Sequence, residues 1–461
     1  MSKVFVYSIL ALIVLKIGAA FFTNFSLYGD EAQYWLWSKE LDFGYYSKPP
    51  LLAWFLFGHT AFFGDSFFSL KMFPLLVYFL IFFAFYKLCL ELNFSKNNSV
   101  ICSVSFLSIP AASVSSFLIS TDLMLLLFWA LSMMILLRIR SVGSLKNFLL
   151  LGIFLGLAFL AKYAAIYFLL SFLILVFIDK KILVVLKKNK ISFFAFVLTL
   201  LLVVLPNVYW NFNNGWVTLS HTADNTNLQN LDLNFYEPLK FLVSQIFMLG
   251  VVLFFSFLYV IRSFHLDFEN KFLLVFSLPI IFIVLIESFL VRANANWAAP
   301  ALVSLFILMY KLVAQRNNRL IIINFATNYL VGAFLFVSIL ISSNLTIFDR
   351  IKGLDAFVND IVKIVGDKDI VISDRILFSS MSYEMRNKPN NIFMPYREGG
   401  AITNHFQMSS PLNKLHKDNF YLIGGGAVIS YLINENEINL LKEFDVSFSS
   451  SNLKLYEVVF K

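Results

Sequence analysis

Apolar runs long enough to cross a membrane recur along the first three quarters of the chain. A membrane-spanning helix needs roughly 17–25 predominantly apolar residues. The pattern predicts about eleven such helices, one more or fewer depending on how the longest runs are divided. The predicted segments are 4–22, 69–90, 99–117, 121–137, 148–161, 163–178, 191–210, 238–261, 272–290, 298–313 and 320–341. The fold class predicted for this part is an all-α polytopic membrane protein.

The pattern changes after about residue 345. Charged residues become frequent, and short β-rich runs (DIVISD, NIFMPY, NFYLIGGG, LKLYEVVF) alternate with helix-like runs (LDAFVNDIVKIV, EINLLKEF). Short strand-like runs mixed with helical periodicity are typical of an α/β domain. We therefore predict a transmembrane domain at 1–344 and a small C-terminal α/β domain at 345–461.

Basic residues lie mainly in short loops between the apolar runs. Lysine and arginine gather at 138–146, 180–190 and 311–319, and such loops face the cytoplasm in membrane proteins. The loops at 28–50 and 211–237 then fall on the opposite face. With an odd number of spans the C-terminal domain lies there too. We expect a multi-pass protein of the cytoplasmic (cell inner) membrane whose functional loops face the periplasm.

Composition supports the membrane assignment and excludes other classes. The chain is 59% hydrophobic and only 14% charged, whereas soluble domains have about 25% charged residues. The net charge of +8 does not indicate nucleic acid, because the basic residues follow the loops. Cys89 and Cys102 lie in or beside apolar segments, so neither a disulfide framework nor a zinc site is expected.

The first outer loop carries the strongest chemical signal. It reads YGDEAQYWLWSKELDFGYYSKPP, with the acid pair Asp30–Glu31 at the start of a stretch with helical spacing. Lys48 precedes two prolines, which fix the local backbone. A general base and a phosphate-binding cation are the minimum set for moving a sugar from a lipid phosphate to a hydroxyl. The alternatives are that Asp30 is an N-cap, Glu31 a first-turn residue, and Lys48 an interfacial lysine that reaches to water.

Six blocks in order resemble a known superfamily. They are YGDEAQYWLWSKEL with GYYSKPPLLAWF, SFFSLKMFPLL, STDLMLLLFWAL, GLAFLAKYAAIYF, LPNVYWNFNNGWVTLSHTADN and RANANWAAPA. This series is similar to the polyprenyl-phosphate-sugar-dependent glycosyltransferases. These include the dolichyl-phosphate-mannose protein mannosyltransferases and the bacterial lipid A aminoarabinose and galacturonic acid transferases. Leu123 and Met124 stand where the family often has proline or alanine. The tail matches only loosely, around ISDRILFSSMSYEM and TNHFQM.

The resemblance implies a type C glycosyltransferase fold with a cavity open to the periplasm. It also implies inverting transfer, by a single displacement, from a polyprenyl-phosphate sugar to a lipid, glycan or protein acceptor of the cell envelope. Asp30 would be the base, and Glu31 would orient the acceptor or base or merely cap the helix. Residues expected to contact substrate are Lys48, Asp122, Lys162, Tyr163, Arg292 and Asn296.

Each of these contacts also has a structural alternative. Asp122 follows a threonine and could belong to a helix cap. Lys162 and Arg292 could be interfacial anchors, although a charge within or beside a span generally faces a cavity or a partner. Arginine binds phosphate oxygens well, which favours a functional role for Arg292.

A metal site is not expected. Some family members hold a divalent metal with a histidine and a loop carboxylate, which makes His221 a weak candidate. The residue before the Lys-Pro-Pro step, which is often acidic in relatives, is Ser47 here. We therefore predict no obligatory metal and no other cofactor.

Two other functions stay open at this stage. A transporter or flippase of lipid-linked glycans would also carry charges within the membrane. It should show broken helices in paired repeats, and no repeat is evident. A ligase-type polymerase should rely on a large periplasmic loop rich in arginine and histidine, whereas the loops here are modest.

Overall fold

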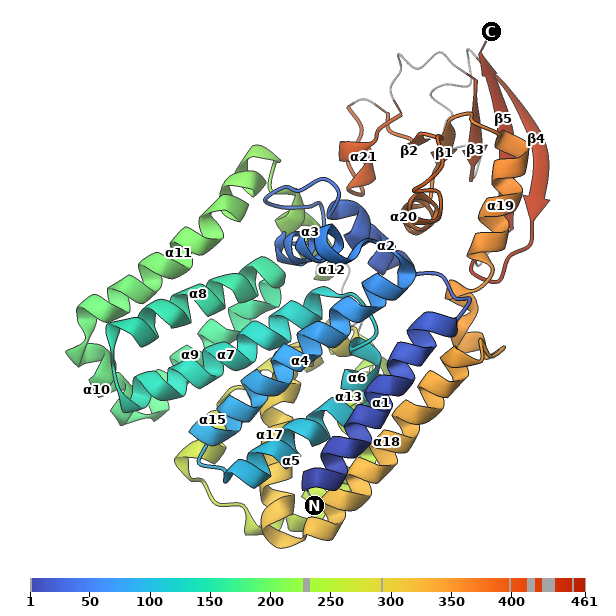
Figure 1. Ribbon diagram of the computed structural model, residues 1–461. Helices are drawn as coiled ribbons and strands as arrows, with labels where there is room; N and C mark the ends of the chain where they lie inside the picture. Colours follow the sequence, from blue (N-terminus) through green and yellow to red (C-terminus); the bar gives the residue numbers. More distant parts are fainter. Residues whose placement is uncertain are drawn as a thin grey trace.

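The computed structural model describes residues 2–226, 233–291, 293–397, 399–412, 419–424, 436–449 and 452–460. Figure 1 shows a long body of roughly aligned helices that contains the N-terminus. A smaller domain at one end of this body contains the C-terminal strands. The division of the chain into domains at 1–344 and 345–461 stays a prediction.

The body consists of helices and their connecting loops in the part of the chain that is described. Its first half contains α1 (Ser2–Phe22), α2 (Gly29–Trp37), α3 (Leu51–Phe63), α4 (Phe67–Glu91), α5 (Lys96–Ser108), α6 (Pro110–Ser115), α7 (Thr121–Ser141), α8 (Leu145–Ala161), η1 (Tyr163–Ala165) and α9 (Ile166–Ile178). Its second half contains α10 (Lys180–Lys188), α11 (Lys190–Asn213), α12 (Val217–Thr226), α13 (Tyr236–Leu249), α14 (Val251–Val260), η2 (Ile261–Ser263), α15 (Phe268–Val275), α16 (Leu278–Leu290), η3 (Ala295–Ala298), α17 (Ala299–Arg316) and α18 (Asn318–Leu340).

All eleven predicted apolar segments overlap helices, and a multi-pass membrane protein is confirmed. Seven helices among the described residues are long and apolar enough to span a membrane, or eight if one bent pair counts as a span. The helices at 145–161 and 163–178 are shorter. The number of eleven spans therefore stays a prediction.

The segment at 238–261 is not one straight helix. It breaks at Gly250, where α13 and α14 meet at 96°. Gly250 has a φ of +103°, and an added Cβ would lie 2.7 Å from the amide nitrogen of Asn328. The side-chain oxygen of Asn324 accepts a hydrogen bond from the amide of Leu253 at 3.0 Å. A glycine backbone and a buried asparagine cap thus satisfy the groups that the break exposes.

Two helices lie outside the predicted membrane spans. α3 begins directly after Pro50, and its 13 residues are too few for the length criterion of a span. α12 lies within the loop predicted at 211–237. Both helices belong to the end of the body that faces the C-terminal domain (Figure 1).

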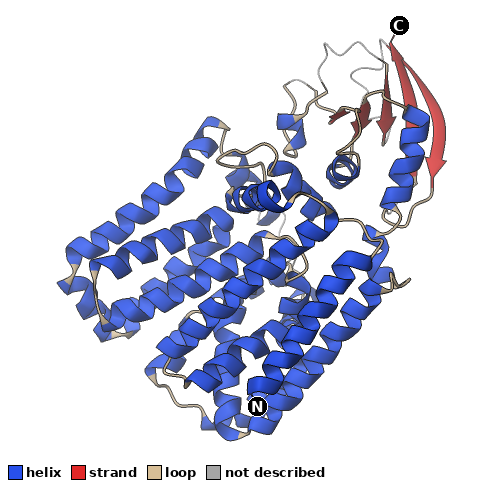
Figure 2. Cartoon of the chain, viewed as in Figure 1, coloured by secondary structure: helices blue, strands red, loops and turns tan. Residues whose placement is uncertain are grey.

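The C-terminal domain is a five-stranded sheet with helices against it, which confirms the predicted α/β class. After η4 (Thr346–Ile351) come α19 (Leu354–Val365), β1 (Ile370–Ile372), α20 (Arg375–Glu384), β2 (Ile392–Phe393), α21 (Phe406–Ser409), β3 (Phe420–Ile423), β4 (Asn436–Phe444) and β5 (Leu453–Phe460). The strand order is β2-β1-β3-β5-β4. β1 pairs in parallel with β2 and β3, and β5 is antiparallel to β3 and β4. In Figure 2 the strands lie beyond the end of the helical body, next to the C-terminus.

One prediction in this domain is wrong. The run EINLLKEF was expected to be a helix, but it forms most of β4. A register shift lies between Leu440 and Lys442 in the pairing of β4 with β5. The extra residue of such a bulge interrupts the strict alternation of a strand. In the sequence Ile438, Leu441 and Phe444 recur every three residues, a spacing that is typical of a helix.

The C-terminal domain docks on the body through α20 and α2. Gly29 allows a close approach, because a Cβ there would lie 2.2 Å from a methyl carbon of Ile376. The hydroxyl of Ser379 donates to the carbonyl of Gly29 at 3.1 Å. The rings of Trp35 and Tyr383 lie edge to face with their centroids 5.0 Å apart. This docking brings the start of α20 beside the predicted acid pair.

Candidate active site

The first turn of α2 positions the acid pair. α2 begins at Gly29 with Tyr28 as its N-cap, so the alternative of Asp30 as the N-cap is not what the structure shows. The backbone amide of Tyr28 donates to a carboxylate oxygen of Glu31 at 3.0 Å. Acidic residues are favoured at this end of a helix by its dipole. The two neighbouring carboxylates make separate sets of contacts.

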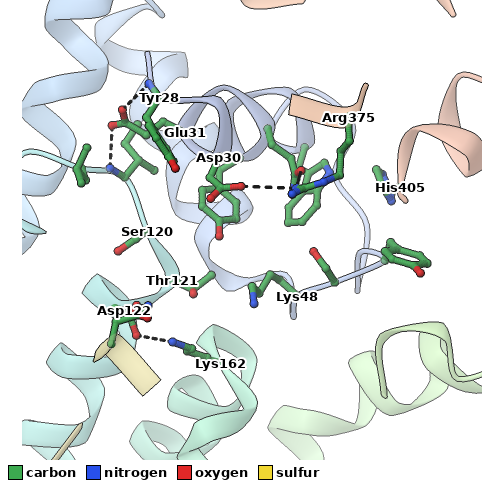
Figure 3. A pocket seen from close by; sticks show the side chains of 18 of the residues that line it. Tyr28, Asp30, Glu31, Lys48, Ser120, Thr121, Asp122, Lys162, Arg375 and His405 are labelled. Carbon is green, nitrogen blue, oxygen red and sulfur yellow. Dashed lines mark hydrogen bonds and ion pairs between the residues drawn. The ribbon is translucent and has the colours of Figure 1, made fainter. Parts of the chain in front are cut away.

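The predicted outer loops meet around one cavity of about 430 Å³. Figure 3 shows the side chains that converge on it. Its lining includes the predicted residues Asp30, Glu31, Lys48, Asp122, Lys162, His221 and Asn296. These residues are far apart in the sequence, and the fold brings them to one end of the helical body. The convergence predicted from the loops is therefore found at the level of side chains.

Asp122 lies in the first turn of α7 and is held from two sides. One carboxylate oxygen accepts a hydrogen bond from the ammonium of Lys162 at 2.7 Å. The other accepts from the side-chain amide of Asn296 at 2.9 Å. The N-cap of α7 is Ser120 rather than Asp122. Asp122 thus links three segments at the base of the cavity.

Lys48 is the cation in this cavity without a partner in the described part of the chain. A tight turn holds it, in which the backbone amide of Tyr45 donates to the carbonyl of Lys48 at 3.1 Å. Burial lowers the pKa of Lys48 to about 8, and the charge of Lys162 acts in the same direction. The charges of Asp122 and Asp30 oppose this shift. An anion bound here would restore the ordinary preference for the charged form.

Asp30 points into the cavity and faces an arginine of the C-terminal domain (Figure 3). Nη1 of Arg375 lies 3.5 Å from a carboxylate oxygen of Asp30. The same nitrogen donates a hydrogen bond to the side-chain oxygen of Gln33. The Asp30 side chain is 46% exposed, so its carboxylate is accessible to a molecule in the cavity.

Glu31 is engaged in a buried ion pair. Nζ of Lys71, on α4, lies 2.7 and 2.6 Å from its two carboxylate oxygens. The backbone amide of Ile119 donates to the same carboxylate at 3.0 Å. Glu31 is 1% exposed and Lys71 is 3% exposed. With the bond from the backbone amide of Tyr28, these contacts are those of the capping alternative and also tie α2 to α4. A role of Glu31 in orienting the acceptor or the base stays a prediction.

Tyr163 lies beside the cavity rather than in it. Its hydroxyl donates to the side-chain oxygen of Asn207 at 2.7 Å and accepts from Asn211 at 3.1 Å. It lines a neighbouring groove together with Lys48 and Lys162. Contact between Tyr163 and a substrate that extends into this groove stays a prediction.

Arg292 lies outside the described residues, so its predicted contact with substrate is not tested. His221 lines the cavity, and its ring centroid lies 4.9 Å from that of Tyr46. Over the described ranges, no three His, Cys, Asp or Glu side chains gather in a way that could hold a metal ion. The prediction of no obligatory metal remains a prediction.

Two grooves adjoin the cavity. One shares Ser47, Lys48, Lys162 and Trp297 with it and runs along η1 and the start of α9. The other shares Ser120, Asp122 and Asn296 and is walled by apolar side chains. These walls come from α5, α6, α7, α13 and α17. The charged cavity is therefore continuous with apolar surface, as a site for amphipathic molecules requires.

The residues that the C-terminal domain contributes to the cavity are not among the predicted site residues. Arg375, Thr403 and His405 line the cavity, and so does Gln33 of α2. Burial between aromatic rings lowers the pKa of His405 to about 4, so this side chain is neutral at pH 7. The run SDRIL shows an ordinary helix start, in which Asp374 is the N-cap, and nothing in it indicates a cavity.

Comparisons with known proteins find similar sequences. A family model described as dolichyl-phosphate-mannose-protein mannosyltransferase matches residues 47–210. The lipid A galacturonosyltransferase RgtD of Rhizobium johnstonii is 28% identical over 279 residues, which are 60% of this chain. The match spans 58% of that relative's length.

Solved structures show the same fold. Crystal structures of ArnT from Cupriavidus metallidurans, in the apo state and bound to undecaprenyl phosphate, match with TM-scores of 0.69 and 0.68. Each covers 98% of this chain and 97% of that chain at 12% identity. The apo oligosaccharyltransferase of Archaeoglobus fulgidus matches with a TM-score of 0.51 at 11% identity. This match covers 84% of this chain and 64% of that chain. The predicted type C fold is thereby confirmed.

Proposed function

We propose that this chain is a glycosyltransferase of the polyprenyl-phosphate-sugar-dependent superfamily and moves a sugar from a polyprenyl-phosphate carrier to a cell-envelope acceptor. The observation that carries the proposal is one cavity that joins an accessible carboxylate, a lysine with no partner among the described residues, an apolar groove beside Asp122 and a mixed polar and apolar groove beside Lys48. The ArnT structure with bound undecaprenyl phosphate and the lipid A transferase relative support a carrier and an acceptor of this kind.

In the proposed reaction an acceptor hydroxyl attacks the anomeric carbon of the donor sugar. The bond from this carbon to the phosphate oxygen breaks, and its electron pair leaves with the phosphate. The hydroxyl proton passes to the Asp30 carboxylate, which acts as the general base. Lys48 offsets the charge on the leaving phosphate. One displacement inverts the configuration of the anomeric carbon.

The carrier chain is proposed to occupy the groove that begins at Lys48 and Lys162. A phosphate held by these two cations would place its lipid directly at the mouth of this groove. The second groove, beside Asp122, then offers apolar surface to an acceptor that is itself a lipid. Lipid A and related glycolipids fit this description.

The orientation of the protein in the membrane is part of the same proposal. The basic helix α10 lies at the end of the body opposite the C-terminal domain (Figure 1). Because basic loops face the cytoplasm, the cavity and residues 345–461 are assigned to the periplasmic side of the cell inner membrane.

The function can be tested with the full-length protein in lipid nanodiscs. The assay supplies radiolabelled undecaprenyl-phosphate sugars (a uronic acid, an aminopentose and a hexose) with a cell-envelope extract. We expect a labelled product from at least one donor. The absence of any covalent product, together with movement of the lipid across reconstituted vesicles, would replace the transferase by a flippase.

Donor binding should weaken at alkaline pH because of Lys48. With a pKa of about 8 in the unoccupied site, Lys48 is mostly charged at pH 7 and loses its charge as the pH rises past 8. Only the charged form attracts phosphate, so the KM for the donor should rise by about tenfold per pH unit above this value. Lys48→Arg should keep the KM flat to pH 9.5, because a guanidinium stays charged. A parallel rise in the arginine variant would remove Lys48 from donor binding.

A further inference from the structure

We propose that Arg375 binds an anionic group of the acceptor and thereby makes the C-terminal domain select acceptors that carry phosphate or carboxylate. This inference rests on the proposed function, because it assigns the acceptor side of the same site. It concerns a residue outside the segment that the family model matches.

The local structure fixes where Arg375 can act. It is the first residue of α20, and the side chain of its N-cap, Asp374, accepts the amide of Leu377 at 2.7 Å. The docking of α20 on α2 then sets the position of the backbone relative to the cavity. Only the side chain of Arg375, which is 41% exposed, remains adjustable.

Arg375 has donors to spare. Both of its contacts, to Asp30 and to Gln33, are made by Nη1. A guanidinium carries five N–H donors in a planar fork, so Nε and Nη2 remain for a further acceptor in the described structure. A fork of this kind matches the oxygens of a phosphate or carboxylate.

The position of Arg375 identifies the acceptor rather than the donor as its ligand. Lys48 and Lys162 lie on the side of the cavity toward the grooves, where the donor phosphate is proposed to bind. Arg375 belongs to the C-terminal domain and lies beside Asp30, at the end of the cavity away from Lys162, with Lys48 between the two cations (Figure 3). Because the base must touch the acceptor hydroxyl, a cation 3.5 Å from the base must also be near the acceptor.

An anionic acceptor group bound at Arg375 would also change the pairing of charges in the cavity. Asp122 is paired with Lys162, and Glu31 with Lys71. Arg375 is the cation that faces Asp30, the carboxylate proposed to take the proton. An anionic acceptor group would compete for this guanidinium and release Asp30. A neutral acceptor would leave the pair between Asp30 and Arg375 closed.

The experiment measures binding, so it does not depend on turnover. Full-length protein in nanodiscs is titrated with three probes, namely phosphorylated lipid A, the same lipid A after removal of its phosphates, and the dephosphorylated form carrying a sugar carboxylate. We expect the wild type to bind at least one anionic probe roughly tenfold more tightly than the neutral probe. A difference of about this size is what one charge-assisted hydrogen bond contributes to affinity. Arg375→Gln should lose this preference, and Arg375→Lys should keep part of it.

Arg386→Gln is the matched control. Arg386 follows α20, and its guanidinium lies 3.9 Å from Asp65 of the body, but it does not line the cavity. This variant should keep the wild-type preference. An unchanged preference in Arg375→Gln, or an equal loss in Arg386→Gln, would overturn the inference. A preference that depends on Arg375 in a protein that transfers no sugar would uphold the inference and count against the transferase function alone.

Discussion

Replacing Asp30 with asparagine is expected to lower the rate of sugar transfer by roughly 10²–10⁴-fold, the range that loss of a general base produces. Asparagine has nearly the same shape and can still accept a hydrogen bond from Arg375, so the cavity should keep its form. It cannot take up the proton of the acceptor hydroxyl. The effect should appear in kcat, measured with a radiolabelled polyprenyl-phosphate sugar, while the KM for the donor changes little.

Asp65→Asn provides the control for this substitution. Asp65 lies in the loop before α4 and pairs with Lys39 at 2.9 Å, but it does not line the cavity. The same chemical change at this position should leave transfer within about twofold of the wild type, because exposed ion pairs contribute little. Equal transfer by Asp30→Asn and the wild type would remove Asp30 from the mechanism.

The core of the candidate site could be predicted from the sequence because of where its charges stand. Asp30, Lys48, Asp122 and Lys162 all adjoin long apolar runs. A charge in such a place must face water, a cavity or a partner, since the hydrocarbon offers it no solvation. The assignment of the loops to one face then required these residues to share a compartment, and the structure places them around one cavity.

The contribution of Arg375 could not be predicted in this way. Its neighbours along the chain form an ordinary capped helix in a domain with many charged residues. Its place beside Asp30 depends on how two domains dock, and this docking depends on the fit between Gly29 and Ile376. A single sequence contains no local pattern that reports such a contact.

Lys71 did give a signal that the sequence analysis did not use. It interrupts the apolar run SFFSLKMFPLL, and an isolated charge within a span requires a partner. The first turn of α2 decides which of the two adjacent acids is the partner of Lys71. That turn directs Glu31 toward α4 and leaves Asp30 facing the cavity, so the two acids of the pair differ in their contacts because they differ in direction.

The ion pair between Glu31 and Lys71 is expected to be the most sensitive polar contact of the body. Glu31→Gln leaves the ammonium of Lys71 buried without a counter-charge, and breaking a buried pair in this way costs about 3–5 kcal/mol of unfolding free energy. We expect a marked fall in the thermal midpoint of the purified protein, measured by intrinsic fluorescence. Glu91→Gln, which breaks the more exposed pair with Arg138, should cost less than about 1 kcal/mol.

The double variant Glu31→Gln with Lys71→Met separates a structural from a chemical role for Glu31. Removing both charges takes away the uncompensated ion, so stability should recover most of the loss. If Glu31 acts only by holding α2 against α4 and the segment before Asp122, transfer should recover together with the thermal midpoint. A stable double variant that still fails to transfer sugar would mean that the Glu31 carboxylate itself takes part in the reaction. A single variant as stable as the wild type would show that the pair does not hold this end of the body together.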